Sequence, residues 1–345
     1  MSNPLHVHSL DDLTRDRLEK ILDRAERLRG QSALELLRGR SIINLFLSPS
    51  LRTRVSMELA ARQLGAHCVT LQEDAGLWKL EFNAGAVMRG ETVEHAKDAI
   101  GVLARYGDLL AVRAFPARRS WEEDARDPIL NAFKRWSPRP VLNLESSLYH
   151  PCQALADILT IRRAAGGGDA REVGRPGKIV LSWADHPKCL PVAVPNSFAL
   201  AMTQMGFDLT IARPEGYDLP AEVMQRCIEH AARSGGRVEV TADREAAFAG
   251  ARFVYAKSWG RIDRYGREAE ELAERKAGGL ARWIVDGEIM RRTDDAHFMH
   301  CLPVRRNVVV ADEVIDSPRS LILDEAENRL HGQKALLLEQ LGVEA

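Results

Sequence analysis

The sequence contains few cysteines, and their spacing matches no known metal site. The five cysteines are scattered, without a C-x-x-C pair or a Cys/His spacing typical of zinc sites. They are Cys68, Cys152, Cys189, Cys227 and Cys301. This pattern is typical of proteins from a reducing compartment. We therefore expect no disulfide bonds and no structural metal. We also expect no metal in the functional site and no cofactor.

Long apolar runs and an excess of charge are also lacking. No uninterrupted apolar stretch reaches the roughly 18 residues of a membrane-spanning helix, and the N-terminal residues MSNPLHVHSLDDL have no basic segment followed by an apolar one. Lys and Arg number 48 against 49 Asp and Glu, which gives a formal net charge of -1. This balance provides no bulk attraction to nucleic acid or membrane. The sequence therefore predicts a soluble, cytoplasmic protein whose basic sites are local.

The length and the hydrophobic pattern indicate two α/β domains. The 345 residues, 45% of them hydrophobic, are enough for two domains of ordinary size. Short apolar runs alternate with segments of helical periodicity, which indicates parallel sheets flanked by helices. We predict strands at 41–47, 66–71, 108–115, 139–145, 178–183, 207–212, 237–241, 251–256, 282–286 and 297–302. We predict helices at 9–28, 53–64, 93–106, 127–136, 150–165, 196–206, 221–234, 243–249 and 325–341.

The expected domain boundaries follow from this alternation. The first domain comprises residues 1–149 and the second residues 150–324, and the C-terminal helix within 325–345 packs back on the first domain. The segment GGGDAREVGRPG at 166–177 is the best loop candidate. Its glycines precede a strand, whereas a dinucleotide-binding fingerprint follows one. An NAD-linked dehydrogenase is therefore disfavoured.

The segment Ser48–Arg54 (SPSLRTR) lies where a predicted strand ends and a helix begins. The free N–H groups and the positive dipole end of a helix N-terminus are well suited to a phosphate dianion. Arg52 and Arg54 add charge-assisted hydrogen bonds, and since both oppose the helix dipole we expect an anion to compensate them. The alternative is a capped helix with a solvated basic first turn.

Two further segments stand out less clearly on their own. One is His150-Pro151, directly before a predicted helix, although a lone histidine is more often structural than catalytic. The other is HFMHCLPVRRN at 297–307, where an apolar strand ends in His-Cys-Leu-Pro. Cys301 alone is most simply a small buried side chain, and no Ser/His/Asp or Cys/His triad is suggested.

Together these motifs resemble the aspartate/ornithine transcarbamylase family. Ser50–Arg54 matches S-x-R-T-R, His150–Gln153 matches H-P-C-Q and His300–Pro303 matches H-C-L-P, in the family's order. The resemblance extends from about Ile42 to Lys334. It implies one domain that binds carbamoyl phosphate, here residues 1–149, and one that binds the amino acceptor. It also implies a homotrimer with active sites between subunits.

The resemblance implies which residues bind carbamoyl phosphate. The matching positions are Ser50, Leu51, Arg52, Thr53, Trp78, Arg113, His150, Gln153, Cys301, Leu302 and Arg329. Arg52, Thr53 and His150 match the groups that polarise the carbamoyl oxygen, so Arg52 and His150 are the expected catalytic residues.

Other positions of this set match different parts of the ligand. Gln153 and the backbone at Cys301 and Leu302 match the groups that receive the carbamoyl amide. Trp78 resembles a residue that a neighbouring subunit inserts into the site. For Trp78 the alternative is a core aromatic side chain.

The acceptor motifs differ from those of ordinary ornithine transcarbamylases. The D-G-x-N-N motif and the acidic D-x-W-x-S-M-G loop are missing, and YAKSWG places Lys257 where an anion would bind an α-ammonium. An acylated α-amine is neutral and needs no carboxylate partner, whereas the α-carboxylate still needs a cation. The chain is similar here to the N-acylornithine transcarbamylases. This similarity implies that Glu145, His186, Lys257 and Arg305 contact the acylated ornithine.

The acyl group is indicated by Val93. Relatives specific for N-acetylornithine resemble this chain at GETVEH but have a glutamate at Val93 and a carboxylated lysine at Val309. A glutamate would repel the second carboxylate of a succinyl group, and valine does not. The segments 78–81, 191–199 and 214–219 also look more like the succinyl-specific enzyme, although Val93 replaces its usual proline.

The expected function is transfer of the carbamoyl group from carbamoyl phosphate to N-succinyl-L-ornithine, in arginine biosynthesis. One alternative acceptor is N-acetyl-L-ornithine. Another alternative is a non-catalytic, metabolite-binding paralogue, which we would expect to have lost Arg52, His150 or the His-Cys-Leu-Pro turn. All three are present.

Overall fold

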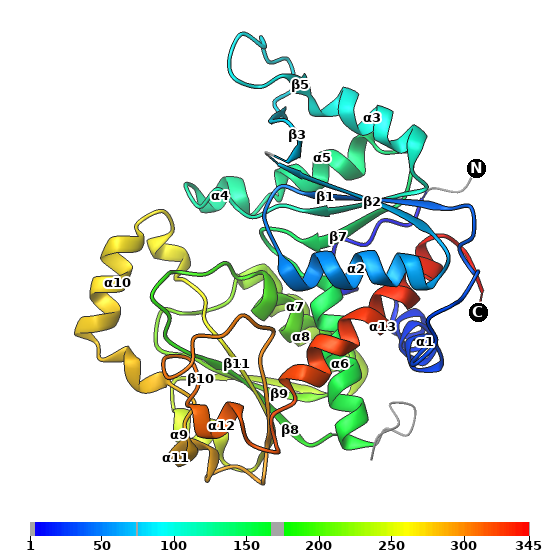
Figure 1. Ribbon diagram of the computed structural model, residues 1–345. Coiled ribbons are helices and arrows are strands. Elements are labelled where there is room, and N and C mark those ends of the chain that lie inside the picture. Colours follow the sequence, from blue (N-terminus) through cyan, green and yellow to red (C-terminus); the bar gives the residue numbers. More distant parts are fainter. Residues whose placement is uncertain (1–3, 74, 167–175, 345) are drawn as a thin grey trace. The chain divides into compact units, whose positions relative to one another are not determined.

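A computed structural model of the chain describes residues 4–73, 75–166 and 176–344 (Figure 1). Most of the loop expected at 166–177 lies outside these ranges. Contacts within the chain define two units. Unit 1 comprises Met1–Ala117, Glu122–Cys152 and Arg329–Ala345, and unit 2 comprises Arg118–Trp121 and Gln153–Asn328.

Unit 1 contains a parallel sheet with the strand order β3-β2-β1-β6-β7. Its strands are β1 (Ser41–Phe46), β2 (His67–Glu73), β3 (Gly76–Leu77), β6 (Leu109–Arg113) and β7 (Val141–Glu145). Its helical segments are η1 (Leu10–Asp12), α1 (Arg15–Arg27), α2 (Leu51–Gln63), α3 (Ala96–Tyr106), α5 (Pro128–Trp136) and the part of α13 (Ile322–Gln340) from Arg329 onward. The short strands β4 (Leu80–Glu81) and β5 (Glu94–His95) form a separate two-stranded sheet. The short helix α4 (Trp121–Asp124) has its first residue in unit 2 and the others in unit 1.

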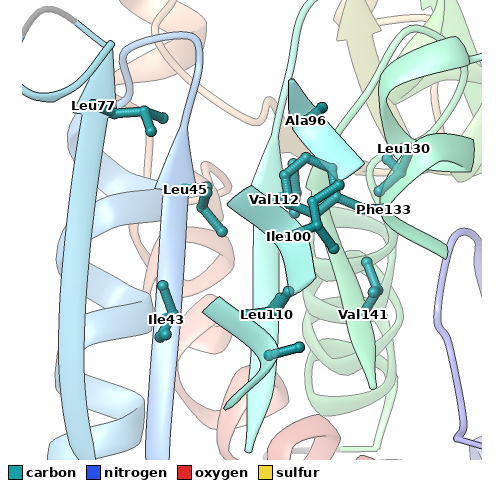
Figure 2. Close-up of a cluster of buried hydrophobic side chains, with 11 residues drawn as sticks. Ile43, Leu45, Leu77, Ala96, Ile100, Leu110, Val112, Leu130, Phe133 and Val141 are labelled. Atoms are coloured by element: carbon teal, nitrogen blue, oxygen red, sulfur yellow. The ribbon is translucent and has the colours of Figure 1, made fainter. Parts of the chain in front are cut away.

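The core of unit 1 explains why these apolar runs form strands. Side chains from β1, β6 and β7 pack against α3 and α5 on one face of the sheet (Figure 2). Helix α2 lies on the opposite face (Figure 1). Because both faces are covered, these strands are almost continuously apolar, as buried parallel strands usually are.

Unit 2 repeats this design. Its parallel sheet has the strand order β10-β9-β8-β11-β12. The strands are β8 (Lys178–Trp183), β9 (Asp208–Ala212), β10 (Arg237–Thr241), β11 (Ala251–Lys257) and β12 (His297–Met299). The helical segments are α6 (Pro151–Ala165) from Gln153 onward, α7 (Ala193–Gln204), α8 (Ala221–Ser234), α9 (Arg244–Phe248), η2 (Ile262–Arg264), α10 (Glu268–Ala277), η3 (Leu280–Trp283), α11 (Gly287–Met290), α12 (Asp312–Ile315) and the part of α13 before Arg329. The predicted fold class, two parallel-sheet domains flanked by helices, is confirmed.

Two secondary-structure predictions are wrong. Residues 282–286 form no strand, because Arg282 and Trp283 end the 3-10 helix η3 and Asp286 caps α11. Trp283 and Val285 are nevertheless buried, which explains the apolar run that suggested a strand. The single helix predicted over 9–28 is two segments. Ser9 and Asp12 form a capping box around η1, Leu13 is extended, and α1 then begins with Thr14 as its N-cap.

Strand order determines where a ligand site forms in such sheets. In each unit the chain continues to one side of the first strand and later returns to its other side, which places switch points between β1 and β6 and between β8 and β11. Ligands of open α/β sheets bind at the carboxyl ends of the strands at such points.

Within the part of the chain that the structure describes, no helix has the length and hydrophobicity needed to cross a membrane.

Candidate active site

The predicted phosphate site lies at the N-terminus of α2, directly after β1. The Ser50 hydroxyl accepts a hydrogen bond from the backbone N–H of Thr53 at 3.2 Å, so Ser50 caps the helix. No acidic residue lies in the first turn, where half-buried Arg52 adds its positive charge to the positive end of the helix. Buried Arg329 donates from Nη2 to the Thr53 hydroxyl at 3.2 Å. A second guanidinium therefore reaches the same turn.

Arg54 differs from Arg52, although the sequence suggested both. Its side chain is exposed and donates to Glu58 at 3.1 Å and to Gln72 at 3.3 Å. Arg54 is therefore occupied on the surface of α2 and of β2. Of the two arginines in this turn, Arg52 is the half-buried one.

A buried ion pair lies at the carboxyl ends of the neighbouring strands β6 and β7. Arg113 ends β6 and pairs through Nη1 with the Glu145 carboxylate at the end of β7. The same carboxylate oxygen is 3.5 Å from Nε2 of His150. The buried Nε of Arg113 has no hydrogen-bond partner among the described residues. Glu145 therefore orients both predicted carbamoyl phosphate contacts, Arg113 and His150, and leaves one donor of Arg113 available.

The His-Cys-Leu-Pro turn of unit 2 follows β12. Leu302 has a φ of 54°, in the left-handed region that a leucine rarely adopts, and a cis peptide bond follows it. The backbone N–H of Leu302 donates to Nδ1 of His300 at 2.8 Å, and the backbone N–H of His300 donates to Glu325 at 3.0 Å. A leucine in the left-handed region whose backbone is held by side-chain hydrogen bonds is typical of functional sites.

Three predicted acceptor residues form a cationic cluster in unit 2, comprising His186, Lys257 and Arg305. His186 follows β8, Lys257 ends β11, and Arg305 follows β12. The pKa of His186 is lowered, first by burial and further by the charges of Lys257, Arg305 and Arg275. The imidazole is therefore neutral near pH 7, and the net positive charge of the cluster comes from its lysine and arginine.

The two cations of this cluster have no anion of their own. The half-buried Lys257 ammonium and the exposed Arg305 guanidinium form no hydrogen bond or ion pair with any described residue. The adjacent Arg306, in contrast, pairs with Asp312 at 2.8 Å and with Asp316 at 2.6 Å. A cation beside a sheet edge without a partner is expected to bind an anionic group of a ligand.

Arg275 of α10 connects the loops that carry this cluster, and sequence reasoning missed it. Its guanidinium donates to the carbonyl of His186 at 3.1 Å and to the carbonyl of Trp259 at 3.2 Å. It also pairs with buried Glu271, which compensates its charge. The acidic first turn and basic last turn of α10 are a helix signal that could have revealed this segment.

Trp78 and Val93 lie together on the segment between β3 and α3. The Trp78 indole N–H donates to Glu94 at 2.9 Å, and the backbone N–H of Val93 donates to the carbonyl of Lys79 at 3.3 Å. Trp78 is 54% exposed and Val93 is 67% exposed. Trp78 is therefore not a core aromatic residue of its own chain.

The structure thus brings the predicted residues into a few groups. Ser50, Thr53 and Arg329 are directly linked, as are Arg113, Glu145 and His150. In unit 2, hydrogen bonds through Glu325 link Gln153 to the turn that contains Cys301 and Leu302. The cationic cluster of His186, Lys257 and Arg305 is a second group in this unit. Glu325 and its buried neighbour Asp157 were not among the predicted site residues.

Comparison with known proteins identifies the family. The aspartate/ornithine carbamoyltransferase carbamoyl-P binding domain matches residues 5–163, and the Asp/Orn binding domain of the same family matches residues 192–339. The chain is 42% identical to an N-acetylornithine carbamoyltransferase of Xanthomonas campestris pv. campestris, over 98% of each protein. It is 39% identical to an N-succinylornithine carbamoyltransferase of Bacteroides thetaiotaomicron, over 86% of each protein.

A solved structure agrees with these relatives. It is an N-acetyl-L-ornithine transcarbamylase variant with a glutamate replaced by valine, complexed with carbamyl phosphate and N-succinyl-L-norvaline. The TM-score is 0.91 at 42% identity, and the match covers 97% of this chain and 99% of that chain. The resemblance indicated by the three sequence motifs is confirmed, and the chain belongs to the aspartate/ornithine carbamoyltransferase family.

Proposed function

We propose that this carbamoyltransferase transfers the carbamoyl group of carbamoyl phosphate to the δ-amine of N-succinyl-L-ornithine. The products are N-succinyl-L-citrulline and phosphate, and the reaction belongs to arginine biosynthesis. The observation that carries the proposal is the cationic cluster, in which Lys257 and Arg305 have no anionic partner among the described residues. Free ornithine brings a positively charged α-ammonium, which such a cluster would repel. Acylation removes the charge of the α-amine, so that the α-carboxylate beside it can bind to Lys257 without this repulsion.

Carbamoyl phosphate is the proposed ligand of the α2 N-terminus. Its phosphate would be held by Ser50, Leu51, Arg52 and Thr53 with Arg113 and Arg329. The geometry that supports this assignment is a helix end without acidic residues that buried Arg329 also reaches. The carbamoyl amide would be received by Gln153 and the backbone at Cys301 and Leu302, and the acyl amide of the acceptor by Glu145 and His186.

The proposed chemistry is direct attack by a neutral amine. An alkyl amine has an unperturbed pKa of about 10.4, so the δ-amine must lose a proton before it attacks the carbamoyl carbon. Attack forms a tetrahedral intermediate whose oxygen gains negative charge, and Arg52, Thr53 and His150 would stabilise that oxygen. The C–O bond to phosphate then breaks, and phosphate leaves with the bonding electron pair. After attack the nitrogen carries one proton too many, and the phosphate that departs is itself able to accept it.

The test is citrulline formation from carbamoyl phosphate with free, acetylated and succinylated ornithine in parallel. We expect turnover with the acylated substrates, fastest with N-succinylornithine, and little with free ornithine. Preference for free ornithine would overturn the role of the cationic cluster. The absence of product from all three would indicate a non-catalytic protein.

N-Acetyl-L-ornithine is the second candidate acceptor. It is favoured by the 42% identity to an N-acetylornithine carbamoyltransferase over 98% of the chain. Succinyl is favoured by Val93, because a neutral side chain leaves the second carboxylate of that acyl group unopposed. The solved relative with valine in place of a glutamate also binds a succinylated ligand.

Replacing Val93 with glutamate is expected to shift acyl preference. Val93 is 67% exposed, so the chain should tolerate the substitution without loss of stability. The new carboxylate would oppose the succinyl carboxylate and lower the ratio of kcat/KM for succinylated over acetylated ornithine by about tenfold or more. The control is Val87→Glu, which adds the same charge at a position of the same segment that is 78% exposed. An unchanged ratio in Val93→Glu would show that this residue does not contact the acyl group.

The proposal includes a homotrimer with shared active sites. Leu51, Val55 and Leu59 are four residues apart on α2 and all exposed, which forms an apolar stripe on one side of that helix. Trp78 is also exposed, and it would complete the carbamoyl phosphate site of a neighbouring subunit. Light scattering on the purified protein is expected to give three times the chain mass of 38.4 kDa. A mass of one chain would rule out a shared site.

A further inference from the structure

Two buried carboxyl groups outside the predicted site lie next to it. We propose that Glu325, together with Asp157, is a positioning residue that orients the Gln153 amide and the His-Cys-Leu-Pro turn toward the NH2 group of carbamoyl phosphate. This pair would thereby set the enzyme's selectivity for a carbamoyl over an acetyl group. The inference rests on the proposed function of Gln153 and of the turn.

The geometry of Gln153 is the first observation. Gln153 lies in the first turn of α6, Asp157 one turn later, and Glu325 in the first turn of α13. The amide nitrogen of Gln153 donates to Asp157 Oδ1 at 2.8 Å and to Glu325 Oε1 at 2.7 Å. All three residues are at most 1% exposed. Both N–H groups of the amide are therefore directed at carboxyl oxygens.

This arrangement determines which end of the Gln153 amide faces away from the pair. A side-chain amide has a donor end and an acceptor end. The reversed amide would set its oxygen against two carboxyl oxygens, which is unfavourable in a buried site. The acceptor end of Gln153 therefore lies on the side away from Asp157 and Glu325, where it suits a ligand that donates N–H groups.

Glu325 also holds the second acceptor group. Its other oxygen, Oε2, accepts the backbone N–H of His300 at 3.0 Å, and His300 in turn accepts the N–H of Leu302 at 2.8 Å. One carboxyl group thus fixes the Gln153 amide and the turn whose carbonyls lie at Cys301 and Leu302. The NH2 of a carbamoyl group has two N–H donors, and the Gln153 amide oxygen and the carbonyls of the turn are acceptors of the kind that such donors need.

The burial of the two carboxyl groups beside each other affects their protonation. Burial, and then the charge of Asp157, raises the pKa of Glu325 well above its usual range, and the two carboxyl groups hydrogen-bond each other. The other titratable groups around them are Tyr255 of β11 and Cys301, beside His300. Burial therefore favours the protonated form of Glu325.

Two amide substitutions are predicted to have opposite effects. In Glu325→Gln, the new side chain has one acceptor end for two N–H groups. The acceptor end of the new side chain would bond to the His300 backbone N–H, whose direction is fixed. The Gln153 amide would then rotate so that its oxygen faces the NH2 of the new side chain, and its own NH2 would face the NH2 of the carbamoyl group. In Asp157→Asn, the new amide keeps an oxygen on Gln153, and its NH2 donates to Glu325 in place of the hydrogen bond between the two carboxyl groups. Asp157→Asn is therefore expected to preserve the site.

The experiment compares carbamoyl phosphate, acetyl phosphate and inorganic phosphate by calorimetric titration. Acetyl phosphate has a methyl group in place of NH2 and donates no hydrogen bond. The wild type should bind carbamoyl phosphate far more tightly than acetyl phosphate, since a site built for an N–H donor rejects an analogue without one. Glu325→Gln should reduce this preference about a hundredfold and leave inorganic phosphate binding unchanged.

The controls are Asp157→Asn and Glu327→Gln, the latter an exposed glutamate on the same helix. Both should keep the wild-type preference within about threefold, since neither reverses the Gln153 amide. If Glu325→Gln melts far below the wild type, Glu325→Asp replaces it. That side chain is shorter by one CH2 and should reach only one of the two N–H groups, so the preference should fall at least about tenfold.

An unchanged preference in a folded Glu325 variant would overturn the inference, and so would an equal loss in Asp157→Asn. These titrations need no acceptor. Their outcome is therefore distinct from that of the acylornithine assay, whose failure would instead remove the proposed function.

Discussion

Arg52→Ala is expected to lower kcat/KM by about a thousandfold or more while the protein remains folded. Arg52 lies half-buried in the first turn of α2, a turn that contains no acidic residue. An arginine that meets the charge developing on a phosphate leaving group and a carbamoyl oxygen contributes mainly to the transition state. Its removal should therefore lower kcat as well as raise the KM for carbamoyl phosphate.

The stability of this variant should change little. A positive charge in the first turn opposes the helix dipole, an unfavourable interaction of about 0.3–1 kcal/mol that alanine relieves. Thermal melting of Arg52→Ala is therefore expected within a few degrees of the wild type.

The matched control is Arg54→Ala, in the same turn. Arg54 is exposed and bonded to Glu58 and Gln72, so its loss should leave turnover within a few-fold of the wild type. Equal losses in the two variants would show that the turn acts only through its total charge. Full activity in Arg52→Ala would remove the phosphate site from the N-terminus of α2.

Lys257→Met is expected to lower kcat/KM for N-acylornithine by about a hundredfold. Methionine is similar in length, so the substitution removes the charge and little of the packing. Hydrogen bonds to charged groups contribute about 1.5–3 kcal/mol, and loss of a cation from a desolvated carboxylate costs at least as much. Because the ammonium has no partner among the described residues, the free energy of unfolding should not fall.

Steady-state kinetics with each substrate varied in turn would check this prediction. The KM for acylornithine should rise, and binding of carbamoyl phosphate in the absence of acceptor should be unchanged. Lys276→Met, an exposed lysine of α10, is the control and should match the wild type. An unchanged KM for acylornithine in Lys257→Met would mean that the α-carboxylate binds elsewhere.

Much of the fold was predictable because its signals are local. The apolar runs of β1, β6, β8 and β11 are buried parallel strands, and their periodicity does not depend on distant residues. The helix over 9–28 was predicted as one piece because the pattern of Leu10, Leu18 and Ile21 continues through the break. The extended Leu13 and the Thr14 cap that separate η1 from α1 are decided by a few hydrogen bonds.

The parts of the site that sequence reasoning missed depend on distant partners. Arg275 and Glu271 look like an ordinary surface ion pair one helical turn apart, but both are buried and hold loops that follow β8 and β11. Gln153 and Glu325 are separated by 172 residues, and neither sequence neighbourhood suggests that their side chains meet. The exposure of Trp78 was equally undecided, since an isolated tryptophan has no periodic pattern around it.

A crystal structure with carbamoyl phosphate and N-succinyl-L-norvaline would test the central claim most directly. Norvaline lacks the δ-amine, so both ligands should remain intact. We predict the phosphate at the N-terminus of α2 in contact with Ser50, Arg52 and Thr53, and the α-carboxylate of the acylated amino acid on Lys257. A phosphate bound elsewhere, or a carboxylate that does not contact Lys257, would contradict the account.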